Sequence, residues 1–159
     1  ERARACGADV SLAFALPERL PLPEADFCMA MANLLENAVE ACERAATEGA
    51  QGSGSARAGT DGRSALPDGA RTLFMDAEVR VEGSAVLVSV RNNCSSTDAR
   101  ALAAAAPNGV LSSGARSAKR EGDGIGLASV ATRYRGEVRV ETDEHAATIR
   151  VLLRAGGAR

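Results

Sequence analysis

The chain has 159 residues, of which 45% are hydrophobic, only 3% aromatic and 25% charged, and its formal net charge is −2. This composition is typical of one soluble globular domain with a core of Ala, Val, Leu and Ile. The lack of an apolar run of about 18 residues excludes a membrane-spanning helix, and the small negative charge argues against a nucleic-acid-binding surface.

The first part of the chain predicts a strand and then a helix. Apolar residues alternate with small or polar ones over residues 9–16, which indicates a half-buried strand. The side chains on its apolar face are Val10, Leu12, Phe14 and Leu16. Residues 23–45 then carry apolar side chains at helical spacing, with Glu24 and Asp26 in the first turn, where acidic groups suit the helix dipole.

Residues 48–70 differ in character from both flanks. The stretch is rich in Gly and Ser and holds one large aliphatic residue, Leu66, so it cannot bury enough apolar surface to order itself. We expect a flexible surface insertion and not a domain boundary, because both flanks are needed for one core. Residues 1–159 therefore form a single predicted domain.

The next segments predict a β-hairpin and a short helix. Over residues 72–93, valines alternate with polar residues on two strands that a tight Glu-Gly-Ser turn joins. Residues 95–109 predict a helix that Ser96 or Thr97 caps and that a Pro-Asn-Gly sequence ends.

The last third predicts an irregular segment, a helix and a second hairpin. Residues 110–124 are polar, residues 125–136 have helical spacing, and residues 137–155 form two strands that turn near Asp143. The order of elements predicts an α+β fold, a two-layer sandwich. Helices would cover one face of a mixed, mostly antiparallel sheet, and the other face would be open to solvent.

The cysteines do not suggest a metal site. Cys6, Cys28, Cys42 and Cys94 form no C-x-x-C pair, and His145 is the only histidine, so we do not expect zinc. Cys28 and Cys42 lie on the helical pattern, where we expect small buried thiols. Reduced cysteines fit a cytoplasmic compartment best.

The predicted helix 23–45 carries Asn33, Asn37 and Glu40 on one face, since steps of four and three residues return to the same side. Asn is a mediocre helix former, so two of them on one stripe need a reason. An amide oxygen is a hard, neutral ligand that suits Mg²⁺. The alternative is that the stripe simply faces water.

Two further stretches could contact a ligand. In GDGIGLASV, Gly122, Gly124 and Gly126 lead into a helix, where close backbone approach and free N–H groups favour a phosphate. The spacing matches neither a dinucleotide fingerprint nor a Walker loop, and a plain connector is an equal alternative. The strand VSVRNNC ends in Asn92 and Asn93, either at a ligand site or in a polar turn.

Taken in order, these stretches resemble a known superfamily. NLLENAVEA resembles the N box of the GHKL (Bergerat-fold) nucleotide-binding proteins, which include gyrase and the sensor histidine kinases, and GDGIGLASV resembles their second glycine box. SAKREGDGIGLASVATRYRGEVRVET is similar to histidine kinases of the quorum-sensing peptide-receptor type. The resemblance covers residues 9–153 apart from the insertion.

The resemblance implies a role for each motif. Asn37 would coordinate Mg²⁺ that bridges the ATP phosphates, and Asn33 would line the phosphate site where gyrase-like ATPases hold a Glu base. Because an amide cannot take a proton from water, transfer to another protein is favoured over hydrolysis. Residues 95–121 would form a mobile lid over ATP. The implied ATP-contacting residues of the lid and glycine box are Arg116, Lys119, Arg120, Gly122, Gly124, Gly126 and Leu127.

Two positions depart from the family pattern. The first glycine box, D-x-G-x-G, reads NNCSS here, with Asn92 in place of the Asp that accepts from the adenine amino group and Asn93 beside it. A neutral acceptor should bind adenine more weakly. Glu40 stands where many kinases of the superfamily have Lys, and its carboxylate would repel phosphate unless it faced Mg²⁺ or solvent.

These features predict the catalytic, Mg²⁺–ATP-binding domain of a sensor histidine kinase. Its partners would be a His on a dimerisation domain outside this chain and then a response regulator, because His145 lies in a predicted hairpin turn and is a poor phosphoacceptor. The chain starts without Met, so we expect a piece of a longer protein. We expect this piece to be monomeric and to be the cytoplasmic part of a membrane-bound receptor kinase. The alternatives are a serine kinase of the anti-sigma-factor type and a degenerate domain that only binds partners.

Overall fold

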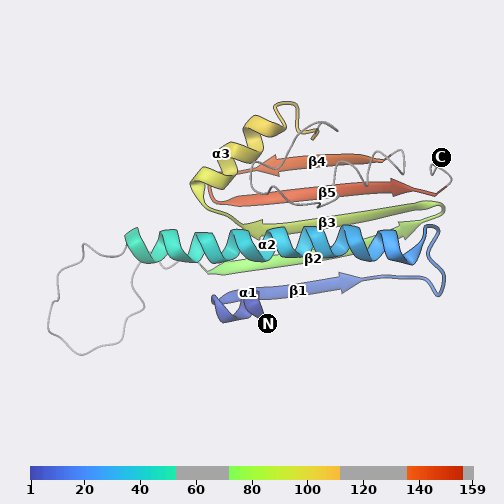
Figure 1. The fold of residues 1–159 in the computed structure, drawn as a ribbon, viewed down its shortest axis with the longest axis horizontal. Coiled ribbons are helices and arrows are strands. Elements are labelled where there is room, and N and C mark those ends of the chain that lie inside the picture. The colour runs from blue at the N-terminus through green and yellow to red at the C-terminus, as the bar shows by residue number, and fades with distance from the viewer. Residues whose placement is uncertain (53–71, 112–135, 156–159) are drawn as a thin grey trace, which may run out of the picture.

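The structure is a computed structural model that describes residues 1–52, 72–111 and 136–155. In these residues, helices and strands form two layers (Figure 1). The elements in chain order are α1 (Arg2–Ala5), β1 (Ala8–Phe14), α2 (Glu24–Gly52), β2 (Leu73–Glu82), β3 (Ala85–Asn93), α3 (Ser96–Ala105), β4 (Glu137–Thr142) and β5 (Ala146–Arg154).

The five strands form one mixed sheet in the order β1-β2-β3-β5-β4. Only β1 and β2 run parallel, and the other neighbours are antiparallel. Helix α2 lies across β2 and β3, and α3 lies against β4 on the same side (Figure 1). The predicted two-layer α+β sandwich is therefore confirmed, while the helix predicted at 125–136 lies outside the described residues.

The core lies between α2 and the middle of the sheet. Val79, Val88 and Val151 stand side by side in the register of β2, β3 and β5, and each is 0% exposed. Leu34 of α2, 1% exposed, packs into the same cluster. Each such side chain contributes about 1.5–3 kcal/mol on burial. This packing determines which face of α2 meets the sheet, and therefore where the face with Asn33 and Asn37 lies.

The other face of the sheet is polar. Its strands present charged side chains that pair along one strand or between neighbours, as in Glu78 with Arg80 at 2.6 Å. Glu137 pairs with Arg139, and Glu141 pairs with Arg150. This agrees with the predicted solvent-facing surface.

Strand β1 exists as predicted, but the predicted burial of its apolar face is wrong beyond Val10. Leu12, Phe14 and Leu16 are 55%, 43% and 45% exposed. Leu12 and Phe14 lie on the helix side, opposite the buried Ala77 and Val79 of β2. They stay uncovered because α2 lies over β2 and β3, and the short α1 packs only at the start of β1 (Figure 1).

Helix α2 is longer than predicted. It continues to Gly52, so residues 48–52 are helical and do not belong to an irregular insertion. Glu48 links this extension to the start of α3. Its carboxylate accepts hydrogen bonds from the Ser96 backbone N–H at 3.1 Å and from the Ser96 hydroxyl at 2.8 Å. These hydrogen bonds lower the pKa of Glu48. The rest of the predicted insertion lies within residues 53–71, outside the described part.

The cap of α3 is Ser95, and the predicted Ser96 or Thr97 is wrong by one or two residues. The Ser95 hydroxyl oxygen accepts from the Asp98 N–H at 3.1 Å and donates to the Asp98 carboxylate at 2.9 Å. The S-x-x-D spacing of a capping box was the available signal. The helix ends at Ala105, just before the Pro-Asn-Gly sequence, as predicted.

Replacing Ser95 with alanine should lower the free energy of unfolding by about 1 kcal/mol, within a range of about 0.5–2 kcal/mol, because the Asp98 N–H loses its acceptor. Urea unfolding followed by circular dichroism would measure the loss. Thr97→Ala is the matched control, since Thr97 is exposed and lies two residues further on. An equal loss in the control would contradict the assignment of the cap.

Candidate functional site

One face of α2 carries the polar stripe that the sequence predicted. Asn33 is half-buried, Asn37 is exposed, and Glu40 is half-buried, whereas Leu34 and Ala38 between them point into the core. The amide of Asn37 is therefore accessible to a ligand. The stripe continues to Arg44, which reaches the N-terminal turn of α3.

Asn92 ends strand β3 on the helix side of the sheet. It stands between Met75 and Ala147 in the register and is only 3% exposed. Its Nδ2 donates to the Asn93 carbonyl oxygen at 2.7 Å. This bond defines the orientation of the amide and leaves Oδ1 as the end that can accept from a ligand.

Small side chains surround the point where α2, α3, β3 and β5 meet. Ala41, Cys94, Ala99 and Ala147 form a buried cluster of their own. The Cys42 thiol donates to the Asn93 carbonyl at 3.7 Å, so the end of β3 lies directly against α2. Asn37 precedes Cys42 by about 7.5 Å of helix axis. The fold thus brings the helix that carries Asn33 and Asn37 to the strand end at Asn92.

Asn93 is held differently from Asn92. Its Oδ1 accepts from the Phe74 N–H at 2.6 Å, and its Nδ2 donates to the His145 carbonyl at 3.4 Å. The side chain thereby ties the start of β2 and the turn before β5 to the end of β3. It is 7% exposed.

His145 lies in the turn between β4 and β5, as predicted. Its N–H donates to Asp143 Oδ1 at 2.9 Å, and its carbonyl accepts from the Cys94 N–H at 3.0 Å. The residue is thus part of a hairpin connection and not of a helix.

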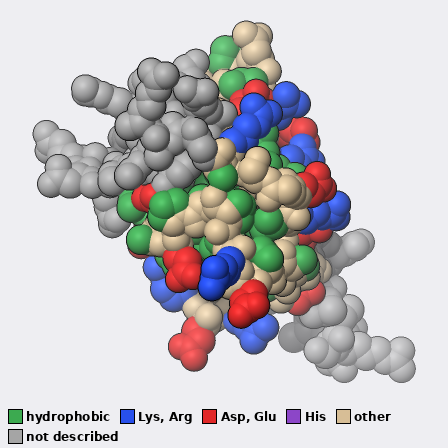
Figure 2. Space-filling model, turned by 90° about the vertical axis from the view of Figure 1, so that its right-hand side faces the viewer, with side chains coloured by type: hydrophobic (Ala, Val, Ile, Leu, Met, Phe, Trp, Pro, Cys, Tyr) green, Lys and Arg blue, Asp and Glu red, His purple; other side chains and the backbone are tan. Residues whose placement is uncertain are grey.

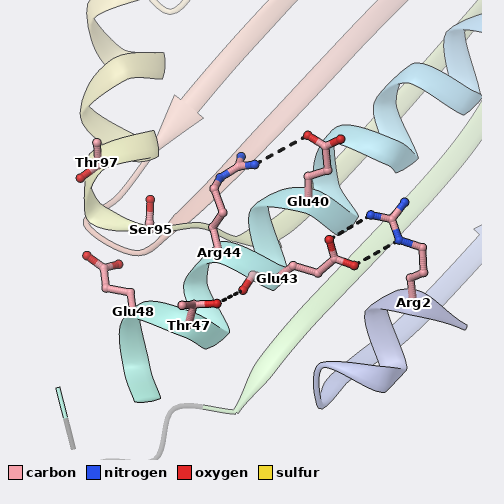
Figure 3. A pocket seen from close by; sticks show the side chains of 8 residues that line it. All are labelled: Arg2, Glu40, Glu43, Arg44, Thr47, Glu48, Ser95 and Thr97. Atoms are coloured by element: carbon pink, nitrogen blue, oxygen red, sulfur yellow. Dashed lines mark hydrogen bonds and ion pairs between the residues drawn. The ribbon is translucent and has the colours of Figure 1, made fainter. Parts of the chain in front are cut away.

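Ion pairs link α2 to α1 and to α3, beside the pocket that Figure 3 shows. Arg44 lies 3.7 Å from the Glu40 carboxylate, and its Nε donates to Asp98 of α3 at 2.7 Å. Arg2 of α1 pairs with Glu43 at 2.9 Å. An open depression of about 630 Å³ lies beside these pairs, and its lining residues are Arg2, Glu40, Glu43, Arg44, Thr47, Glu48, Ser95 and Thr97.

The pairing with Arg44 answers the question that Glu40 raised. The carboxylate lies beside a guanidinium one turn along the helix, which offsets its charge toward any anion nearby. The Glu-x-x-x-Arg spacing could have predicted this pair. The Arg44–Asp98 bond has no comparable sequence signal, because it joins residues far apart in the chain.

The cysteines differ in exposure, and Cys6 is partly buried. Cys42 and Cys94 are 0% and 1% exposed, and burial raises the pKa of each thiol to about 11. Cys28 is exposed, so the prediction of a buried thiol is wrong there. At 3.6 residues per turn it lies about 100° around α2 from Phe27, which points into the core.

In a thiol titration at pH 8, Cys28 should react with a disulfide reagent at least about 100-fold faster than Cys42 and Cys94, because the buried thiols remain protonated. Above the ordinary thiol pKa of 9.0, the unfolded chain should release these protons while the folded chain keeps them, so stability should fall as pH rises. Because Cys6 is only partly buried, the comparison uses a Cys6→Ser background, in which Cys28→Ser should remove the fast phase. A fast phase that persists in this variant would contradict the assignment.

The remaining predicted site residues lie outside the described residues. They are Arg116, Lys119, Arg120, Gly122, Gly124, Gly126 and Leu127, with the part of the predicted lid that follows Leu111. The described residues therefore contribute one side of the candidate site, from α2, the end of β3 and α3. Of the helices that the structure describes, none has the length and apolar character needed to span a membrane.

Comparison with known proteins gives results at the level of structure. No protein-family model and no curated protein matches the sequence. The nucleotide-free catalytic domain of histidine kinase ThkA aligns with a TM-score of 0.55 at 13% identity, over 97% of this chain and 84% of that one. The mycobacterial sensor histidine kinase MprB aligns with a TM-score of 0.52 at 12% identity, over 96% and 85%.

The Acinetobacter baumannii histidine kinase AdeS aligns with a TM-score of 0.54 at 8% identity over 98% of this chain, which spans only 58% of the AdeS chain. At such low identities the likeness concerns the fold. The five-stranded mixed sheet and the helices on one of its faces match these neighbours. The chain therefore shares the fold of the ThkA catalytic domain and of these two other histidine kinases.

Proposed function

We propose that the chain is the Mg²⁺–ATP-binding catalytic domain of a sensor histidine kinase. The observation that carries the proposal is the exposed Asn37 amide on α2, in a GHKL fold that places Asn92 at the facing strand end. The phosphate acceptor would be a His on a dimerisation domain, and a response regulator would receive the phosphate next. We expect the peptide-receptor type, and hence a cytoplasmic domain of a membrane receptor.

The described donors fit this ligand. Asn37 offers a neutral amide oxygen of the kind that Mg²⁺ accepts, and Asn92 Oδ1 offers an acceptor for an exocyclic amine. The nearest carboxylate on the stripe, Glu40, is paired with Arg44. When bound, Mg²⁺–ATP supplies the phosphoryl group and the metal offsets phosphate charge.

The residues of the chain would act mainly by positioning. Asn37 would hold the metal, Asn92 would orient the base, and Asn33 would line the phosphate site without acting as a proton acceptor. The last point supports phosphoryl transfer over hydrolysis. Lys119 and Arg120, from the sequence motif, would offset charge on the phosphates.

Calorimetric titration with Mg²⁺–ATP tests the binding step. We expect a one-to-one complex with a dissociation constant on the order of 10 µM to 1 mM, since the neutral Asn92 gives a weaker bond to adenine than Asp. Chelation of Mg²⁺ should weaken binding. No heat up to millimolar ATP would contradict the proposal and leave a degenerate interaction domain.

Transfer is tested with a protein that joins this chain to the proposed His-bearing dimerisation domain. Labelled ATP should place phosphate on a His of that protein, which acid removes and alkali preserves. Acid-stable phosphate on a serine of a partner would favour the anti-sigma-factor type of kinase.

A further inference from the structure

Strand β1 forms one edge of the five-stranded sheet. It pairs with β2 on one side, and in the described part of the chain no strand pairs with its other side. From Val10 to Pro17 the strand and its continuation carry no charged residue. Natural sheets usually protect such edges with charges, bulges or covering segments. Among the described residues, no charged side chain and no covering element protects this edge beyond the start of β1, so it is suited to pairing with another strand.

The backbone groups of this edge can be assigned from the pairing with β2. The Ala15 N–H donates to the Val79 carbonyl at 3.1 Å, so the odd-numbered residues of β1 point their backbone groups toward β2. The even-numbered residues Val10, Leu12 and Phe14 therefore point theirs outward, since successive residues of a strand alternate in this direction.

The same edge carries exposed apolar side chains. Leu12, Phe14 and Leu16 are each more than two-fifths exposed on or beside the helix side of β1. Leu16 also borders a depression of about 550 Å³ with Pro17, Pro21 and Val81. Figure 2 shows that end of the molecule, where hydrophobic side chains lie exposed among acidic and basic ones. Contiguous exposed apolar side chains commonly mark an interaction surface.

We propose that this edge pairs with the β1 edge of a second copy of the chain, in antiparallel orientation about a two-fold axis at Leu12. This register places Leu12 opposite Leu12 and Val10 opposite Phe14 of the other copy. All of these are residues with outward backbone groups, so the pairs would exchange about six backbone hydrogen bonds. Asp9 would face the uncharged Ala15, so no like charges meet along the paired strands.

A second copy suits this edge for two reasons. The apolar pattern reads the same in both directions about Leu12, which a two-fold interface requires. Helix α1 covers the start of β1 and leaves the Leu16 end open (Figure 1). Antiparallel pairing brings the open end of each copy next to the covered end of the other.

The proposed dimer is independent of nucleotide binding. Asn92 lies on β3, in the middle of the sheet. Helix α3 packs against β4, which is the edge strand opposite to β1. The candidate nucleotide site of each copy would therefore stay accessible in a continuous sheet of two copies. The proposal departs from the monomer that the sequence predicted, and it rests on the exposure of Leu12, Phe14 and Leu16, which the sequence placed on the apolar face of a half-buried strand.

Sedimentation velocity of the isolated chain tests the proposal. A short paired edge with few large side chains gives a weak interface, so we expect a dimer with a dissociation constant on the order of 10–100 µM. Leu12→Lys should raise this constant at least tenfold, because it places two cations at the two-fold axis. Leu87→Lys is the matched control, since Leu87 is 36% exposed on the opposite face of β3.

Cross-linking tests the register. In a Cys28→Ser background, Leu12→Cys should form a disulfide-linked dimer with diamide, because opposed residues in a hydrogen-bonded antiparallel pair have Cα atoms about 5.5 Å apart. Leu87→Cys should give far less. A chain that stays monomeric to millimolar concentration, a dimer that Leu12→Lys leaves intact, or equal cross-linking at both positions would overturn the proposal. Circular dichroism of each variant verifies folding.

Discussion

Replacing Asn37 with alanine should weaken the binding of Mg²⁺–ATP by about 100-fold, equivalent to about 2.7 kcal/mol, and should abolish its dependence on Mg²⁺. The reason is that Asn37 is the accessible amide on the stripe of α2, while its neighbours Leu34 and Ala38 are buried in the core. Asn37→Asp should also lose binding, because a carboxylate adds negative charge beside the phosphates. Calorimetry with and without Mg²⁺ measures both effects.

A matched variant separates this effect from damage to the helix. Glu36 precedes Asn37 and is exposed, so Glu36→Ala should change the affinity for Mg²⁺–ATP less than about threefold. The free energy of unfolding of Asn37→Ala should lie within about 0.5 kcal/mol of that of the unchanged chain, since Asn37 is on the surface and Ala favours helix. An Asn37→Ala variant that binds nucleotide with unchanged Mg²⁺ dependence would remove the role assigned to Asn37.

The sequence predicted the layered fold because its periodicities reflect burial on one side. Val86, Val88 and Val90 alternate along β3, and each is at most 1% exposed on the helix side. Leu34 and Ala38 follow the period of a helix and pack onto these strands. The two motifs around the asparagines and glycines supplied the resemblance to GHKL proteins, and the fold agrees with that of the histidine kinases that align with it.

Burial on β1 could not be predicted in the same way. An alternating pattern shows that a strand has an apolar face, but it does not show which strands a helix covers. A helix is about 10 Å across and strands lie about 4.8 Å apart, so one helix covers about two strands. Helix α2 covers β2 and β3, which leaves Leu12 and Phe14 outside its reach.

The sequence proposes residues for the candidate site, but it does not predict the contacts that hold them. Asn37 and Asn92 belong to motifs that the sequence displays. The bond from Arg44 to Asp98 and the hydrogen bonds of Glu48 to Ser96 join segments that only the folded chain brings together. These contacts couple α2 to the start of the predicted lid, so the helix that carries Asn37, the proposed metal ligand, also positions α3.

Asn93 was predicted to contact the cofactor beside Asn92, and its hydrogen bonds suggest a different contribution. Both ends of its amide bind to other segments, to the Phe74 N–H of β2 and to the His145 carbonyl in the turn before β5. Among the described residues, by contrast, the Asn92 amide bonds through Nδ2 alone, to the carbonyl oxygen of its neighbour. Asn93 should therefore act as a positioning residue that holds the strand end in place for Asn92.

Replacing Asn93 with alanine should lower the free energy of unfolding by about 1–3 kcal/mol, because the Phe74 N–H and the His145 carbonyl lose a buried partner. Asn93→Asp keeps an acceptor for the Phe74 N–H and should cost less. Asn92→Ala should instead weaken nucleotide binding more than stability. Urea unfolding and calorimetry of the three variants separate the roles, and an Asn93→Ala variant of unchanged stability with impaired nucleotide binding would restore Asn93 as a direct contact.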